Sequence, residues 1–176
     1  LLLSCLIVIT LASLAWSVYL TDSDPGRAYF VTTTRGWELA LGAIVAVIAH
    51  KLHRIPLALR HLLGWAGLAG VVLAVLTFSS TTPFPGYHAL LPTLGTAAMI
   101  IAGSGEGEGS LRILEPPFMQ DIGALSYSLY LWHWPAIVGA TVLWGDDNHL
   151  PWTLGDVVVA GSAVPAWFTY RVLESP

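Results

Sequence analysis

Long apolar segments alternate with short segments rich in charged residues, glycine and proline along the whole chain. A helix of about 20 apolar residues crosses the hydrocarbon core of a bilayer, because each residue advances the helix by about 1.5 Å. A helix also satisfies its own backbone hydrogen bonds, which lipid cannot do. We therefore predict six membrane-spanning helices, over residues 1–20, 34–49, 62–78, 88–102, 122–144 and 152–170.

The connecting segments are predicted as loops because they concentrate turn-forming and charged residues. They are residues 21–30, 50–61, 79–87, 104–121 and 145–151. Alternate loops lie on the same side of the membrane, and one side then holds five of the seven Lys and Arg residues: Lys51, Arg54, Arg60, Arg112 and Arg171. The positive-inside rule makes that side cytoplasmic. The second predicted helix then enters from the outside face and the fifth leaves toward it.

Composition supports an integral membrane protein. Hydrophobic residues make up 55% of the chain and charged residues only 10%, and the mean hydropathy is +0.70. Soluble domains carry about 25% charged residues. The expected fold class is all-α, a polytopic membrane helix bundle. A net charge of −4 without a basic patch argues against nucleic-acid binding, and the single cysteine, Cys5, cannot form an internal disulfide.

Polar aromatic residues gather in the fifth predicted helix, in the segment Ser126-Tyr-Ser-Leu-Tyr-Leu-Trp-His-Trp-Pro135. Polar groups at membrane depth usually face a bundle interior or a wet cavity. On a helix, one face carries Ser126, Tyr130, His133 and Ile137, because they are spaced three or four residues apart. A neighbouring stripe of the same helix carries Tyr127 and Trp134. Pro135 predicts a kink, because it lacks an N–H group. The segment fits a ligand cavity, and it fits equally an aromatic helix contact around a satisfied core histidine.

A second informative segment, Arg35-Gly-Trp-Glu-Leu-Ala-Leu-Gly42, opens the second predicted helix. Arg35 and Glu38 are three residues apart, so on a continuous helix they share a face and can form an ion pair. A charge inside a span needs such a partner or water. Gly36 and Gly42 leave room for another helix or a ligand. The alternative is an interfacial ion pair that only anchors the helix.

The sequence predicts no metal site. The histidines of the basic loop, His50, His53 and His61, have no cysteine nearby and no helical histidine pair at metal-ligand spacing. Three consecutive polar residues at 146–148 are weak evidence for a cation. No Gly-x-Ser-x-Gly nucleophile signature and no phosphate-binding Gly-Lys-Ser/Thr segment is present.

Three segments closely resemble, in order, the later part of the membrane domain of bacterial acyltransferase family 3 proteins, in particular the O-antigen acetylase-like branch. They are residues Tyr29–Gly42, Ser126–Pro135 and Tyr170–Pro176, of which the middle one is the most specific. Ser175 departs from the pattern, because the residue there is often basic in the family. Together with the start of the chain inside an apolar run, the resemblance implies that residues 1–176 are a partial transmembrane acyltransferase domain of a longer protein, without its N-terminal helices.

The resemblance implies a bundle of about ten transmembrane helices in the bacterial inner membrane. Such proteins move acyl groups, often acetyl, from an acyl-CoA-type donor, which is a co-substrate and not a permanently bound cofactor, to hydroxyls of a cell-surface carbohydrate or glycolipid. Many members also carry a C-terminal soluble domain. The expected partners are therefore membrane lipid, the acyl donor and a glycan acceptor.

The family's proposed catalytic histidine lies on an early helix, upstream of this chain, so the fragment alone is expected to be inactive. We predict supporting catalytic roles for Arg35, Glu38 and His133. The predicted substrate-binding residues are Trp37, Ser126, Tyr127, Tyr130 and Trp134. Two other functions fit the residues: a transporter or flippase of a lipid-linked glycan, suggested by prolines in three predicted spans, and a non-catalytic membrane scaffold.

Overall fold

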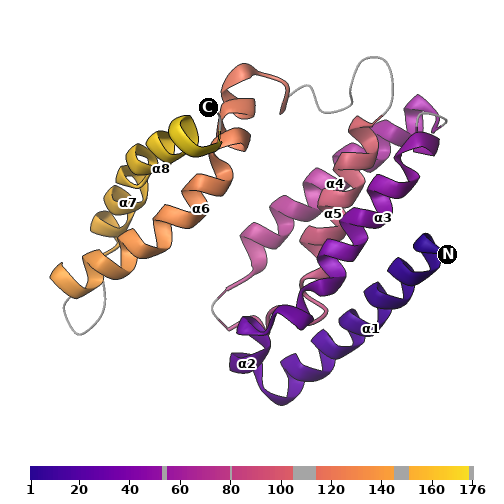
Figure 1. The fold of residues 1–176 in the computed structure, drawn as a ribbon, viewed down its shortest axis with the longest axis horizontal. Helices are drawn as coiled ribbons and strands as arrows, with labels where there is room; N and C mark the ends of the chain where they lie inside the picture. Colours follow the sequence, from indigo (N-terminus) through magenta and orange to yellow (C-terminus); the bar gives the residue numbers. More distant parts are fainter. Residues whose placement is uncertain (53–54, 80, 105–113, 145–150, 175–176) are drawn as a thin grey trace. The chain divides into compact units, whose positions relative to one another are not determined.

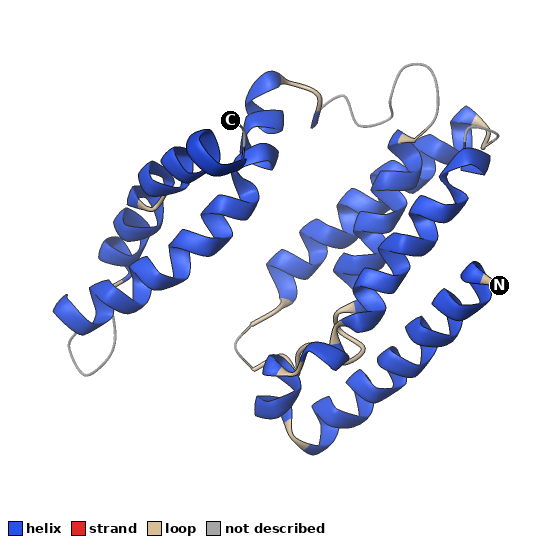
Figure 2. Ribbon diagram, viewed as in Figure 1, coloured by secondary structure: helices blue, strands red, loops and turns tan. Residues whose placement is uncertain are grey.

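The computed structural model describes residues 1–52, 55–79, 81–104, 114–144 and 151–174. These residues form helices joined by short turns (Figure 1) and contain no β-strand (Figure 2). The prediction of an all-α fold is confirmed for this part of the chain. The chain divides into two compact units, Leu1–Arg112 and Ile113–Pro176, and each is described by itself.

The first unit is a layered arrangement of helices in which α5 packs against α4 and α3, and α3 packs against α1 (Figure 1). Short helical turns connect α1 to α3. The elements are α1 Leu2–Ser23, α2 Pro25–Phe30, the 3-10 turn η1 Thr32–Thr34, α3 Gly36–Leu52, α4 Leu57–Thr77 and α5 Leu90–Gly103.

The second unit pairs one long helix with a broken one. The long helix is α6, Pro117–Trp144, and it packs against α7 and α8. α7 runs over Trp152–Gly161 and α8 over Ala163–Thr169, followed by a π-helical turn, Tyr170–Glu174. Figure 1 shows α7 and α8 lying alongside α6.

Helices occupy all six segments that the sequence predicts as spans, but only two are both long and apolar enough to cross a membrane within the described residues. These are α1 and α4. Two shorter apolar helices cover Gly36–Ala49 and Leu90–Gly103. α6 has the length, at 28 residues, but its serine, tyrosine, tryptophan and histidine residues lower its hydropathy. A bundle with six spans therefore stays a prediction.

Small residues occupy most buried positions, whereas large apolar side chains point outward. The exposed set includes Leu76, Val75 and Val142, and the buried set includes Ala28, Ala40, Ala74, Ala102, Ala140 and Ala166. Proteins that fold in water rarely leave so many large apolar residues exposed. Small residues at helix contacts are typical of membrane helices, since they let backbones approach closely. This arrangement fits helices whose outer faces meet lipid or further helices.

α4 and α5 approach each other closely at two glycines, Gly67 and Gly95. A Cβ atom added to Gly95 would lie 2.8 Å from the carbonyl oxygen of Gly67 and 3.2 Å from Cγ2 of Val71. A Cβ atom added to Gly67 would in turn overlap the Gly95 carbonyl. Each helix therefore needs glycine at this crossing.

The prediction of a loop over 21–30 is wrong, because this segment is largely helical. α1 continues to Ser23, and Asp24 then caps the next helix, accepting a hydrogen bond from the Arg27 N–H at 3.0 Å. Pro25 occupies the first position of α2, where its missing N–H costs nothing. Residues that favour turns are here the residues that start a helix.

The prediction of a basic loop over 50–61 is also wrong at both ends. α3 extends to Leu52, and α4 begins at Leu57, directly after Pro56. Arg60 is therefore helical and buried, with its Nε donating a 3.0 Å hydrogen bond to the carbonyl oxygen of Ala102, in the last turn of α5. Carbonyl groups there lack helical partners and favour a cation. Two other basic residues used to orient the chain, Arg54 and Arg112, lie outside the described residues, as does His53.

Proline has different effects in the three segments where the sequence places it inside a span. Pro92 lies in the first turn of α5 and α6 continues through Pro135, but the helix of residues 152–170 is interrupted at Ser162. Pro165 follows three residues later and has no N–H to offer the carbonyl of Gly161. The Ser162 hydroxyl donates to the Val159 carbonyl at 2.6 Å, which stabilises the break.

The predicted loop over 104–121 ends early, because α6 starts at Pro117. Residues 105–113 of that loop lie outside the described part of the chain. Residues 145–150, which include the polar group 146–148, also lie outside it.

Candidate functional site

The first predicted site segment begins with a turn of 3-10 helix that precedes α3. Thr34 closes this turn: its buried hydroxyl donates to the carbonyl oxygen of Ala28 at 2.7 Å and lies 2.5 Å from that of Val31. Arg35 follows the turn and is not part of α3. Glu38 lies in the first turn of α3, with its N–H donating to the Arg35 carbonyl at 3.1 Å. A carboxylate in this position interacts favourably with the helix dipole.

Helix α1 holds this entry to α3 in place through one serine. The Ser13 hydroxyl donates to the Thr33 carbonyl at 2.6 Å and accepts the backbone N–H of Trp37 at 2.9 Å. A Cβ atom at Gly36 would lie 3.1 Å from that hydroxyl oxygen. The predicted role of Gly36 in a close helix approach is therefore confirmed.

Glu38 lines a cleft of about 400 Å³ between α3 and α5. Gly42 lies one turn further along the same face of α3, and a Cβ atom there would meet nothing within 4 Å. The predicted open space beside Gly42 is confirmed. The cleft is lined by Glu38, Leu41, Gly42, Val45, Phe84, Pro92, Thr93, Thr96, Ala97 and Ile100.

The predicted ion pair between Arg35 and Glu38 does not form: among the described residues the two side chains make no contact within 4.0 Å that would count as one. Instead, the Arg35 guanidinium carbon lies 5.2 Å from the centre of the Tyr29 ring and 5.8 Å from that of Phe84. The prediction assumed one continuous helix from Arg35 to Glu38. The 3-10 turn changes the helical phase at Arg35, so the side chain turns toward α2 and the loop before α5.

Trp37, a predicted substrate contact, is buried with 1% exposure and does not line the cleft. Its indole Nε1 has no hydrogen-bond partner among the described residues. An unpaired buried donor costs about 1–3 kcal/mol. The geometry thus gives Trp37 a packing position beside α1, and its role as a substrate contact stays a prediction.

The polar aromatic residues of the second unit lie on α6 as the helical spacing predicts. The ring centres of Tyr130 and His133 are 5.8 Å apart. His133 Nδ1 lies 3.1 Å from the Leu129 carbonyl oxygen. A carbonyl oxygen only accepts, so Nδ1 carries a proton and Nε2 of the neutral ring is left as an acceptor. His133 is half-buried, whereas Tyr130 is exposed.

Three other predicted residues of α6 are also exposed in this unit: Ser126, Tyr127 and Trp134. The Ser126 hydroxyl donates to its own helix, at 2.6 Å from the Gly123 carbonyl oxygen. Exposed ring faces and hydroxyls leave these side chains available to bind a ligand. Whether they do so stays a prediction.

Both units also contain residues of interest that were not predicted from the sequence. In the cleft these are Thr93 and Thr96 of α5, together with the aromatic wall residue Phe84. In the second unit, Trp132 Nε1 donates to the Thr169 hydroxyl at 2.8 Å, which ties α6 to α8. The spacing of Thr93 and Thr96 could have indicated them, because two threonines three residues apart in an apolar helix share a face.

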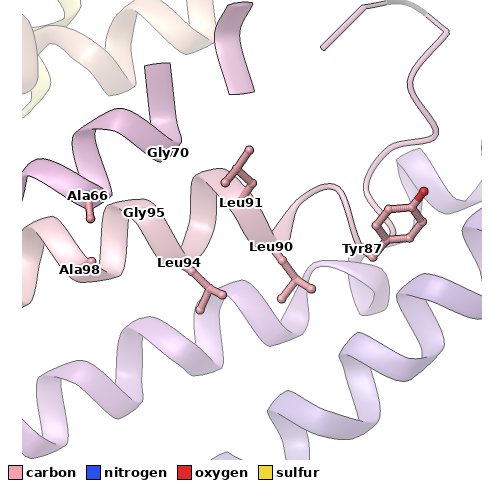
Figure 3. Close-up of a pocket in the computed structure, with 9 residues that line it drawn as sticks. Ala66, Gly70, Tyr87, Leu90, Leu91, Leu94, Gly95 and Ala98 are labelled. Carbon is pink, nitrogen blue, oxygen red and sulfur yellow. The ribbon is translucent and has the colours of Figure 1, made fainter. Parts of the chain in front are cut away.

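A second hollow, of about 460 Å³, lies between α4 and α5 (Figure 3). Its walls are apolar, and Tyr87 lies at one end of it. Small residues create the hollow: Ala66, Gly67, Gly70, Gly95 and Ala98. It offers space for hydrocarbon, and the Tyr87 hydroxyl is the one ionisable side-chain group among its lining residues. Within the described residues, no group of three or more His, Cys, Asp or Glu side chains is placed to hold a metal ion.

Comparison with known proteins gives one family. The model of the family described as "Acyltransferase domain" matches residues 1–171. The chain is 29% identical over 97% of its length to "Putative peptidoglycan O-acetyltransferase YrhL" of Bacillus subtilis, and 27% identical over its full length to "Peptidoglycan O-acetyltransferase OatA" of Listeria monocytogenes. It is 31% identical over 75% of its length to "Putative membrane-bound transacylase BcsY" of Komagataeibacter xylinus.

The chain spans about a third or less of these relatives, namely 28%, 30% and 33% of their lengths. No solved structure matches it.

Proposed function

We propose, from the premise that this chain belongs to the acyltransferase domain family, that the intact protein is a membrane O-acyltransferase. It moves an acyl group, acetyl in the names of two relatives, to a hydroxyl of a cell-surface carbohydrate or glycolipid. The donor is a thioester of the acyl-CoA type. The chain on its own is expected to be inactive, because the family resemblance puts the catalytic histidine upstream.

One observation carries the proposal: Glu38 lines the cleft between α3 and α5 without an ion-pair partner or hydrogen bond among the described residues. Its carboxylate is therefore free to accept a hydrogen bond from an acceptor hydroxyl. Thr93 and Thr96 of the opposite wall come from α5. A site that binds a sugar hydroxyl needs a few polar groups in a mostly apolar cleft, and this cleft has them.

The chemistry requires a base and a stabilised oxyanion. The acceptor oxygen attacks the thioester carbonyl carbon, the C–O bond forms as the C–S bond breaks, and the hydroxyl proton passes through the base to the thiolate. Glu38 orients the hydroxyl, and Arg35 supplies positive charge at the same end of α3. In the second unit, the proposal gives His133 a supporting role and assigns glycan contacts to Ser126, Tyr127, Tyr130 and Trp134.

The proposal includes a multi-pass location in the bacterial inner membrane. The outward-facing large apolar side chains and the two long apolar helices support it. Membrane lipid is then a partner of the helix surfaces, and a soluble domain after the bundle is expected in the intact protein.

The test is mass spectrometry of surface glycans from cells that carry the intact gene. We expect Glu38→Gln to lower acylation about 10²-fold or more, while membrane insertion is unchanged. Glu115→Gln is the matched control, because Glu115 is exposed and outside the cleft. Full activity of Glu38→Gln would remove the residue from the site. Glycan movement without an acylated product in the wild type would instead identify a transporter or flippase.

A further inference from the structure

We propose that Arg35 forms an anion subsite at the edge of the cleft and binds a phosphate group of one of the two substrates. The inference rests on the proposed acyltransferase function and adds the charge of the ligand to it.

Two aromatic rings from separate segments surround the guanidinium group. Tyr29 comes from α2, and Phe84 comes from the loop before α5, with ring centres 5.2 Å and 5.8 Å from the guanidinium carbon. Ring faces attract a cation but accept none of its N–H groups as an oxygen would. They therefore hold the arginine in place without using its hydrogen-bonding capacity.

The N–H donors of Arg35 have no acceptor in the described part of the chain. Glu38 attracts Arg35 electrostatically, but the two side chains form no ion pair within 4.0 Å and no hydrogen bond. A guanidinium group has five N–H donors in a planar fork. A half-buried fork with no acceptor is an arrangement that an anionic ligand would complete.

Phe84 connects this arginine to the reaction site, because the same ring contacts Arg35 and lines the cleft that contains Glu38. A ligand in the cleft can therefore reach Arg35 past one side chain. Arginine recognises phosphate with two parallel hydrogen bonds. A neutral acceptor hydroxyl does not need a positively charged partner at this position. A phosphate on the same substrate or on its co-substrate would pair with the Arg35 guanidinium.

Two sources could supply this phosphate, and the experiment separates them. The intact protein in lipid nanodiscs is assayed with acetyl-CoA against acetyl-pantetheine, which lacks the phosphates. In the second arm, a disaccharide on a lipid diphosphate is compared with the same disaccharide on an uncharged lipid. Each rate is measured for the wild type, Arg35→Gln, Arg35→Lys and the control Arg27→Gln, an exposed arginine of α2.

We expect Arg35→Gln to lower kcat/KM about 10- to 100-fold more with the phosphate-bearing substrate of one arm than with its neutral analogue. The arm that shows this difference identifies the source. Arg35→Lys keeps the charge but loses the fork, so its loss is smaller. Arg27→Gln should behave as the wild type. An equal loss with charged and neutral substrates in both arms, or no loss in either, would overturn the subsite.

If the wild type acylates neither acceptor, the proposed function fails, and the subsite is then judged by binding alone. Thermal unfolding is measured with and without inorganic pyrophosphate. An increase in the unfolding temperature for the wild type and Arg27→Gln that is absent in Arg35→Gln supports the subsite. The same increase in all three proteins, or none in the wild type, refutes it.

Discussion

Filling the cleft at Gly42 should separate activity from stability. A Cβ atom at this position meets nothing within 4 Å, although Gly42 is in the middle of α3 and lines the cleft. Replacing a helical glycine with alanine or leucine stabilises the helix by about 0.5–1 kcal/mol, since the unfolded chain loses conformational freedom. Gly42→Ala and Gly42→Leu should therefore unfold at the same temperature as the wild type or slightly above it.

The effect on activity follows from the volume of the cleft. A water-sized group occupies about 30 Å³, so the four carbon atoms of a leucine side chain remove roughly 120 Å³ of the 400 Å³ available. Displacing a bound substrate by about 1 Å costs about 10²-fold in rate. We expect Gly42→Leu to lower kcat/KM about 10²-fold, and Gly42→Ala by less than about tenfold.

The assay is acyl transfer by the intact protein, followed by thermal unfolding of the same samples in detergent. Gly139→Leu is the matched control, because Gly139 also lies within a helix and an added Cβ there meets nothing within 4 Å. A fully active Gly42→Leu would show that substrate does not occupy the cleft. A strongly destabilised Gly42→Leu would show that the space beside α3 is filled in the folded protein.

Three further predictions test the framework around the cleft and the residues of the second unit. Gly95→Leu should destabilise the protein by about 1–3 kcal/mol in thermal unfolding, because its side chain meets the backbone of α4, whereas Gly70→Ala should be tolerated, since its nearest contact would be an ordinary 3.5 Å. Thr21→Val removes the buried hydroxyl that accepts the Gly86 N–H at 3.0 Å and should cost about 1–3 kcal/mol; unchanged stability would mean that this hydrogen bond is absent. His133→Gln should insert into membranes normally and lose about 10²-fold in acylation by mass spectrometry, whereas unchanged activity would leave His133 a packing residue.

The helical fold could be predicted because lipid and helix geometry leave few alternatives for long apolar segments. The helix ends could not, since Asp24, Pro56 and Pro117 start helices inside segments whose composition is that of a loop. Proline is favoured both in turns and in the first turn of a helix, and aspartate is favoured both in turns and at the residue that caps a helix. Only packing against the rest of the chain decides between the two.

The candidate site was predictable along one helix and not across two. Glu38 and Gly42 share a face of α3, as their spacing requires. The opposite wall comes from Thr93 and Thr96, and no local pattern shows that α5 lies beside α3. Arg60 illustrates the same limit, because its partner, the carbonyl of Ala102, is 42 residues away in the sequence.

The failed ion pair is the most informative difference between sequence and structure. Opposite charges 4 Å apart attract by about 4 kcal/mol at an effective dielectric constant of 20. Arg35 and Glu38 interact electrostatically but form no ion pair within 4.0 Å, so they keep only part of this attraction. The helix dipole stabilises the Glu38 carboxylate by about 0.3–1 kcal/mol, and the rings of Tyr29 and Phe84 stabilise the Arg35 guanidinium by about 0.5–1 kcal/mol. Departures from the locally best arrangement concentrate at functional sites, where a ligand supplies the missing interaction. Two separated opposite charges at one end of α3 therefore leave a carboxylate for a hydroxyl and a guanidinium for an anion, which a closed ion pair would not.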